Sequence, residues 1–130
     1  MARTNDLRRY IEYALNSIKT EYALQDHAIT YRIASDANMY PHIVYEITAM
    51  TPTDMGREDY TVDIHIFAKD QAYALNLADG IVDLFSFNNA PQATILPTFY
   101  LVSTGNLEDP DKTICHTVVR FEVQNYRRVK

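Results

Sequence analysis

The first candidates for chemistry are a carboxylate and an imidazole on one short segment, Asp63 and His65. They lie within EDYTVDIHIFAKD, residues Glu58 to Asp70, where apolar and polar residues alternate. Successive side chains of a β-strand point to opposite faces, so this alternation predicts a half-buried strand. Asp63 and His65 therefore share its polar face, opposite the apolar positions Tyr60, Val62, Ile64 and Ile66.

Two other segments, PHIVYEITAM and HTVVRFEVQNY, show the same alternation and add further polar side chains. If the three strands belong to one sheet whose apolar side is covered by helices, their polar faces point the same way. One surface would then collect seven polar side chains, which are His42, Glu46, Asp63, His65, His116, Arg120 and Glu122.

Three histidines and three carboxylates on one surface raise the possibility of a metal site, because these groups bind zinc, iron and manganese. The spacing does not favour it: each strand offers one histidine, and the chain has no HExxH, no CxxC and no Asp-rich calcium loop. We therefore predict a solvated or subunit-facing surface with no metal ligand and no cofactor. As exposed residues, Asp63 and His65 should then contribute little to stability.

Catalytic fingerprints are also missing from the sequence. It has no GxSxG elbow, no P-loop and no GxGxxG, and three glycines leave little material for phosphate-binding loops. Cys115 lies on the apolar parity of its strand, which predicts a buried, inert thiol. Thr61 is the only hydroxyl residue on the polar parity of the strand of Asp63 and His65, and threonine is simply a good strand former. We predict no catalytic residues and no enzyme activity.

The elements that position these residues follow from periodicity. Apolar residues at three-to-four spacing predict two helices. Thr4, Asn5 or Asp6 could cap the first helix. Asp70 is expected to cap the second helix, and Gly80 is expected to weaken it. The two apolar stripes are Leu7, Ile11, Ala14, Leu15, Ile18 and Tyr22, then Ala74, Leu77, Ala78, Ile81, Leu84 and Phe85. Strands are predicted over 28–34, from Pro41 to Met50, and over 60–68, 95–104 and 113–126.

The predicted order is helix, three strands, helix, two strands. Two one-sided helices and five one-sided strands imply an α+β fold: a two-layer sandwich with both helices on one face of a mostly antiparallel five-stranded sheet. The 130 residues, 47% hydrophobic and 22% charged, fit a single domain over 1–130.

The charge balance limits the classes of function. With 12 basic and 17 acidic residues the formal charge is −5, and the tail YRRVK is the only basic cluster, so a free-standing nucleic-acid binder is disfavoured. No segment has the apolar character of a signal peptide or a membrane span. A single cysteine excludes an internal disulfide framework, and the chain reads as a cytosolic protein with no membrane partner.

The order and spacing of these segments resemble the tail-terminator, or head–tail joining, proteins of long-tailed bacteriophages, also called tail completion proteins. The resemblance rests on the proline-led strand YPHIVYEI, on YTVDIHIFAKD running into the helix QAYALNLADGIVDLF, and on the final strand HTVVRFEVQNY. It covers nearly the whole chain. The connection from Asn88 to Pro97 and the segment from Gly105 to Lys112 match nothing in the family pattern.

The resemblance implies a virion protein at the tail–head junction, assembled in the host cytoplasm. Such proteins form a ring of about six copies that caps the tail tube and faces the head-side connector or head-completion protein. Double-stranded DNA passes through the lumen without specific binding, and an acidic lumen would let it slide. The family has no catalytic residues to transfer to this chain.

Two polar, turn-rich segments are predicted to be loops that dock on the tube or the connector, Met50 to Asp59 and Gly105 to Asp111. The proposed docking residues in these loops are Asp54, Met55, Arg57, Glu108, Asp109 and Asp111.

The alternatives to the phage interpretation are a small cytosolic dimeric binding module and a metal-binding enzyme domain that uses the His/Asp face.

Overall fold

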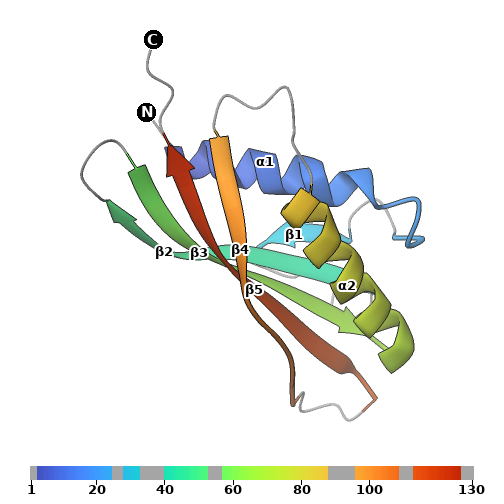
Figure 1. The fold of residues 1–130 in the computed structure, drawn as a ribbon. Coiled ribbons are helices and arrows are strands. Elements are labelled where there is room, and N and C mark those ends of the chain that lie inside the picture. The colour runs from blue at the N-terminus through green and yellow to red at the C-terminus, as the bar shows by residue number, and fades with distance from the viewer. Residues whose placement is uncertain are drawn as a thin grey trace.

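The computed structural model describes residues 3–24, 28–32, 40–52, 57–87, 96–108 and 113–126. Within these ranges, two helices and five strands follow one another in the predicted order (Figure 1). Their bounds are α1 Arg3–Ser17, β1 Ile29–Tyr31, β2 His42–Pro52, β3 Arg57–Ala68, α2 Gln71–Phe87, β4 Leu96–Leu107 and β5 Cys115–Tyr126.

The five strands form one twisted sheet in the order β1-β2-β3-β5-β4 (Figure 1). β1 pairs with β2 in parallel, and the other three pairings are antiparallel, so the sheet is mostly antiparallel as predicted. β3 lies at the centre, between β2 and β5. No helix in the described ranges is long and apolar enough to cross a membrane.

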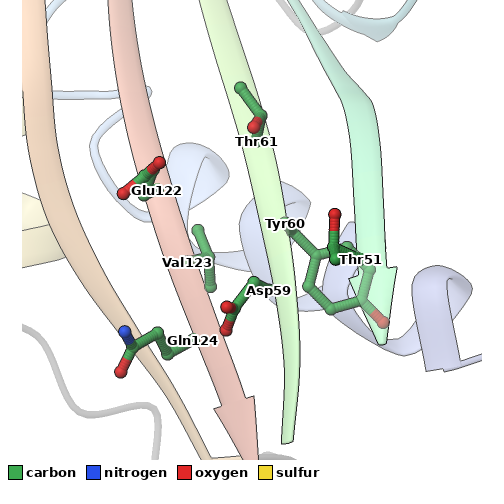
Figure 2. A pocket seen from close by; sticks show the side chains of 7 residues that line it. All are labelled: Thr51, Asp59, Tyr60, Thr61, Glu122, Val123 and Gln124. Carbon is green, nitrogen blue, oxygen red and sulfur yellow. The ribbon is translucent and has the colours of Figure 1, made fainter. Parts of the chain in front are cut away.

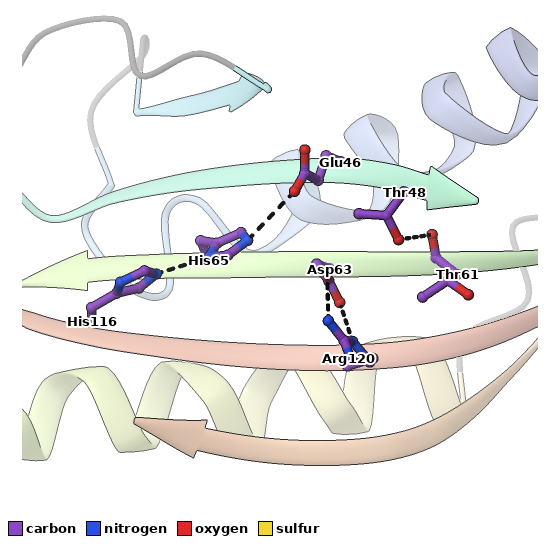
Figure 3. A network of polar contacts seen from close by, with 7 residues as sticks. All are labelled: Glu46, Thr48, Thr61, Asp63, His65, His116 and Arg120. Carbon is purple, nitrogen blue, oxygen red and sulfur yellow. Dashed lines mark hydrogen bonds and ion pairs between the residues drawn. The ribbon is translucent and has the colours of Figure 1, made fainter. Parts of the chain in front are cut away.

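Both helices cover the same face of the sheet, which confirms the predicted two-layer α+β sandwich. Buried residues of α1 and of α2 belong to one hydrophobic core with every second residue of β3 and β5. This core contains Val62, Ile64 and Ile66 of β3 together with Val119 and Phe121 of β5, all with no exposed surface. Figure 3 views the opposite face, where the helices lie behind the strands.

The helix starts follow the predictions in one case and not in the other. Asp70 caps α2 as predicted, because its carboxylate accepts a hydrogen bond from the backbone N–H of Ala72 at 3.0 Å. The capping prediction for α1 was wrong: the helix begins at Arg3, so Thr4, Asn5 and Asp6 lie in its first turn. Asn5 instead accepts a hydrogen bond from Arg8.

β2 ends later than predicted, β3 begins earlier and β4 ends later, whereas β5 begins at Cys115, after its predicted start at Thr113. β2 continues to Pro52 and β3 begins at Arg57, so most of the segment from Met50 to Asp59 is paired strand. β4 continues through Gly105 to Leu107. These strands continue through their turn-forming residues because those residues pair with a neighbouring strand. β1 is shorter than predicted within the described ranges, Ile29–Tyr31.

Gly80 has a packing reason to be glycine. A Cβ at this position would overlap the phenol group of Tyr22, which follows α1. The adjacent backbone is also held, because the Tyr73 hydroxyl of α2 donates a hydrogen bond to the carbonyl of Tyr22 at 2.7 Å. Gly80 therefore lets α2 pack closely against Tyr22. Helix propensity alone would favour alanine at this position and does not explain the glycine.

We expect Gly80→Ala to destabilise the protein by about 1 kcal/mol, because displacing Tyr22 outweighs the gain in helix propensity. In a Tyr22→Ala background the same substitution should stabilise by about 1 kcal/mol, since the obstacle is gone. Denaturant unfolding of the four variants measures both effects. A stabilising Gly80→Ala in the wild-type background would contradict this packing.

Tyr45 is a second unusual buried group, with no exposed surface in the middle of β2. Burial, followed by the negative charge of Glu12 on α1, raises the pKa of Tyr45 to about 12. Burial likewise raises the pKa of Tyr22 and of Tyr73. In the folded protein these phenols therefore keep their protons above the pH at which the unfolded chain would release them.

Stability should fall in alkali for this reason. A raised folded-state pKa gives stability that is fully present below the ordinary tyrosine pKa of 10.0 and lost as pH rises through about 12. We expect the unfolding free energy of Tyr45→Phe to decline less between about pH 8 and about pH 11 than that of the wild type. Equal declines in the two proteins would contradict the assigned environment of Tyr45.

Candidate functional site

The seven polar residues predicted for one surface lie on the face of the sheet that the helices leave open. Figure 3 shows five of them, Glu46, Asp63, His65, His116 and Arg120. The register that brings them together could not be read from the sequence. Glu46, Asp63 and Arg120 form one row across β2, β3 and β5, since Glu46 pairs with Asp63 and Asp63 pairs with Arg120. His42, Phe67 and His116 form a second row.

Asp63 and Arg120 make a two-bond ion pair. The Arg120 Nε donates to one carboxylate oxygen at 2.7 Å and a terminal nitrogen donates to the other at 3.1 Å. These hydrogen bonds, and then the charge of Asp63, raise the pKa of Arg120 above its usual value. Two like charges directly opposite, Glu46 and Asp63, would repel. Arg120 offsets that repulsion from the other side of Asp63.

His65 lies between Glu46 and His116. Its Nδ1 is 2.8 Å from Nε2 of His116, and its Nε2 is 3.8 Å from a carboxylate oxygen of Glu46. A hydrogen bond between two imidazole nitrogens requires one to donate and the other to accept. Both rings are partly buried, so the contact fixes their orientation on the sheet.

His42 belongs to a row of neighbouring rings that crosses the open face. Its ring centroid lies 4.8 Å from that of Phe67, on which it stacks, and 5.2 Å from that of Tyr40, to which it is tilted. Phe67 stacks in turn on His116, with ring centroids 4.2 Å apart. The sequence signal for this row was Phe67, an aromatic residue on an otherwise polar parity.

The prediction that Asp63 is exposed to water was wrong, and His42 on the same surface is also buried. Asp63 and His42 are each only 5% exposed. Asp63 is covered by the Arg120 side chain, and His42 is covered by the neighbouring rings. Consequently Asp63 should matter for stability, contrary to the sequence-based expectation.

Glu122 lies on the same face but away from the ion pairs. It borders a depression of about 210 Å³ between β2, β3 and β5 (Figure 2). Among its described lining residues, two are carboxylates and none is basic, so this part of the lining repels anions. The residues that line it are Thr51, Asp59, Tyr60, Thr61, Glu122, Val123 and Gln124.

The proposed docking residues are only partly located. Arg57 is the first residue of β3 and pairs with Tyr126, so it belongs to the sheet instead of a loop. Glu108 follows β4 and is exposed. Asp54, Met55, Asp109 and Asp111 lie outside the described residues.

Glu46, Asp63 and His65 are close enough to be considered as metal ligands, with one ligand atom from each within 4.8 Å of the others. Against this, both oxygens of Asp63 are hydrogen-bonded to Arg120, so a cation there would lie beside the guanidinium charge. We expect elemental analysis of the purified protein to find no stoichiometric zinc, iron or manganese. About one metal ion per chain, lost in His65→Ala, would overturn this prediction.

The imidazoles and carboxylates of this cluster can hold and pass protons. Glu46, His65 and His116 could relay a proton, and a hydroxyl or thiol nucleophile would need such a base beside it. Cys115 packs against the hydrophobic core, on the side of the sheet away from His116, and is half-buried instead of fully buried as predicted. In the polar network of the described residues, Thr61 takes part through its backbone carbonyl and not through its hydroxyl. That carbonyl accepts a hydrogen bond from the Thr48 hydroxyl.

Comparison with known proteins bears on the fold. No protein-family profile matches the chain, and no curated protein matches it in sequence. Among solved structures, a chain of the virion of a native gene transfer agent (GTA) particle superposes with a TM-score of 0.65 at 10% identity. The match covers 89% of this chain and 91% of that one. The likeness is one of fold. At this identity it transfers no residue roles, but it extends over nearly the whole of both chains.

Proposed function

We propose that this protein is a structural subunit of a phage-like virion and has no catalytic role. The observation that carries the proposal is the shared fold with a gene transfer agent virion chain, which spans 89% of this chain. The open face of the sheet is consistent with it. There the polar side chains are engaged with one another, in the ion pair of Asp63 with Arg120 and the contact of His65 with His116.

Within the virion, we propose that the protein ends the tail tube as a ring of about six copies and joins the tail to the head connector. The sequence resemblance to tail-terminator proteins supports this finer role, and the observed order of helices and strands is the one on which that resemblance rests. The partners would be other copies of the chain, the tail-tube protein and the head-side connector or head-completion protein.

Double-stranded DNA would pass through the ring without specific binding. The formal charge of −5 supports this, because a surface rich in carboxylates repels phosphates. The open face of the sheet, with Glu46, His65 and Glu122, would face either the lumen or another subunit. The segments that contain Asp54, Met55, Asp109 and Asp111, together with Glu108, would contact the tube or the connector.

Particles made without this protein test the proposed role. A tube whose growth is not stopped should continue to polymerise, so the lysate should contain free tails of variable, excessive length and heads without tails. Supplying the wild-type protein in trans should restore joined particles with uniform tails. Normal tails attached to heads in its absence would contradict the role of tail terminator.

A further inference from the structure

The outer edge of the sheet at β4 is apolar and exposed. β4 is the last strand in the sheet order, and its residues Tyr100, Leu101 and Val102 are 50%, 47% and 52% exposed. The register breaks between Leu101 and Ser103, which leaves Val102 as an extra, unpaired residue. Natural sheets usually protect a long edge strand with charges, prolines or bulges; β4 has Pro97 and the bulge at Val102 but carries no charged residue.

One residue of α2 extends this apolar edge onto the helical layer. The Gln71 side chain donates a hydrogen bond to Asn106 of β4, so that side of α2 faces β4. Leu75 lies one turn further along the same side and is 44% exposed. We call Leu75, Leu101 and Val102 the α2–β4 patch; Tyr100 is not part of it, because it pairs with Glu122 and faces the open side of the sheet.

The surroundings of the α2–β4 patch are acidic. Asp79 lies one turn beyond Leu75 and is exposed, and Glu108 follows β4. The sequence from Gln71 to Glu108 contains no lysine and no arginine. Asp79 makes no ion pair within the ranges that the structure describes.

A second exposed surface has the opposite charge. Tyr13 of α1 is 61% exposed and points away from the core, on the helix face opposite Leu7 and Ile11. Arg9 lies one turn before Tyr13 on the same outer face and is exposed. In the described part of the chain Arg9 has no acidic partner. We call Arg9 and Tyr13 the α1 ridge.

We propose that the α2–β4 patch of one subunit binds the α1 ridge of a second copy of this chain. Arg9 lies one turn before Tyr13 on α1, and Asp79 lies one turn after Leu75 on α2. If α1 of one subunit packs antiparallel to α2 of the other, Tyr13 therefore meets Leu75 and Arg9 meets Asp79. The contact removes two exposed apolar surfaces from water and pairs two unpartnered charges.

Because the two surfaces differ, the contact is head-to-tail, and every subunit can offer one surface to each neighbour. Such contacts build a ring when the rotation between subunits closes. The inference thus rests on the proposed ring for its biological role, but the contact itself is a property of this chain.

Charge reversal tests the pairing. Arg9→Glu and Asp79→Arg should each weaken self-association about tenfold or more, measured by sedimentation over a range of concentrations. Mixing the two variants in equal amounts, or combining them in one chain, should restore association because every contact is again opposite in charge. Arg32→Glu, with the same charge change as Arg9→Glu but at an exposed position outside both surfaces, should have no effect. Failure of the mixture to recover would overturn the pairing.

Disulfide trapping detects the contact even when it is weak. In a Cys115→Ala background, a chain with both Tyr13→Cys and Leu75→Cys should give a ladder of covalent oligomers on oxidation, because each subunit links to two neighbours. Chains with only one of these cysteines should give no ladder. Absence of the ladder from the double-cysteine chain at high concentration would also overturn the proposal.

These results separate this inference from the proposed function. Particles that carry the protein at the tail end, with assembly unaffected by Arg9→Glu and Asp79→Arg, would reject these surfaces and leave the tail role intact. A disulfide ladder from a protein located elsewhere in the particle would reject the tail role and leave the contact intact.

Discussion

Ile64→Ala is expected to destabilise the protein by about 2–5 kcal/mol, the largest effect of any single substitution considered. Ile64 has no exposed surface and lies on the central strand, between Tyr45 of β2 and Val119 of β5. Truncation would leave a cavity that the three paired strands cannot collapse to fill.

The adjacent residue gives a matched control on the opposite face of the same strand. The side chain of His65 is 21% exposed, and its contacts with Glu46 and His116 are partly open to water. His65→Ala should therefore change the unfolding free energy by less than about 1 kcal/mol. Chemical denaturation of both variants measures the contrast. Equal losses would mean that the open face is as important for folding as the core.

Arg120→Ala is expected to destabilise by about 2–3 kcal/mol, more than Asp63→Ala at about 1 kcal/mol. The asymmetry follows from exposure, since the Asp63 side chain is 7% exposed and that of Arg120 is 50% exposed. Without Arg120, a buried carboxylate loses two hydrogen bonds and still faces Glu46. Without Asp63, water can solvate the guanidinium, and the repulsion from Glu46 disappears.

The double variant provides the decisive comparison for this pair. Adding Asp63→Ala to Arg120→Ala removes the stranded carboxylate, so the double variant should be more stable than Arg120→Ala alone. Urea unfolding of the two single variants and the double variant measures this difference. A double variant less stable than Arg120→Ala would show that Asp63 stabilises the fold by contacts other than this ion pair.

The elements and layers were predictable because each carries a local pattern. The alternation around Asp63 and His65 fixed the two faces of β3, and the three-to-four stripe of Leu7, Ile11 and Leu15 fixed the buried face of α1. The Asp70 cap is equally local. Such signals need only neighbours in sequence, and the α+β two-layer sandwich follows from them.

The arrangement within the open face was not predictable, because it depends on the register between strands. That Glu46, Asp63 and Arg120 share a row is decided by pairings across β2, β3 and β5. Polar parity predicted a wet Asp63, whereas Arg120 covers it. The bulge at Val102 and the approach of Tyr22 to Gly80 are likewise tertiary features without a local signal.

The most direct test of the proposed role is the position of this protein in the assembled particle. Cryo-electron microscopy of particles that contain it should show a ring of copies at the head-proximal end of the tail tube, with DNA or an open channel along its axis. The fold of each subunit in the density should match the α+β sandwich of Figure 1. Density for this protein at any other place in the particle, or its absence from purified virions, would contradict the proposal.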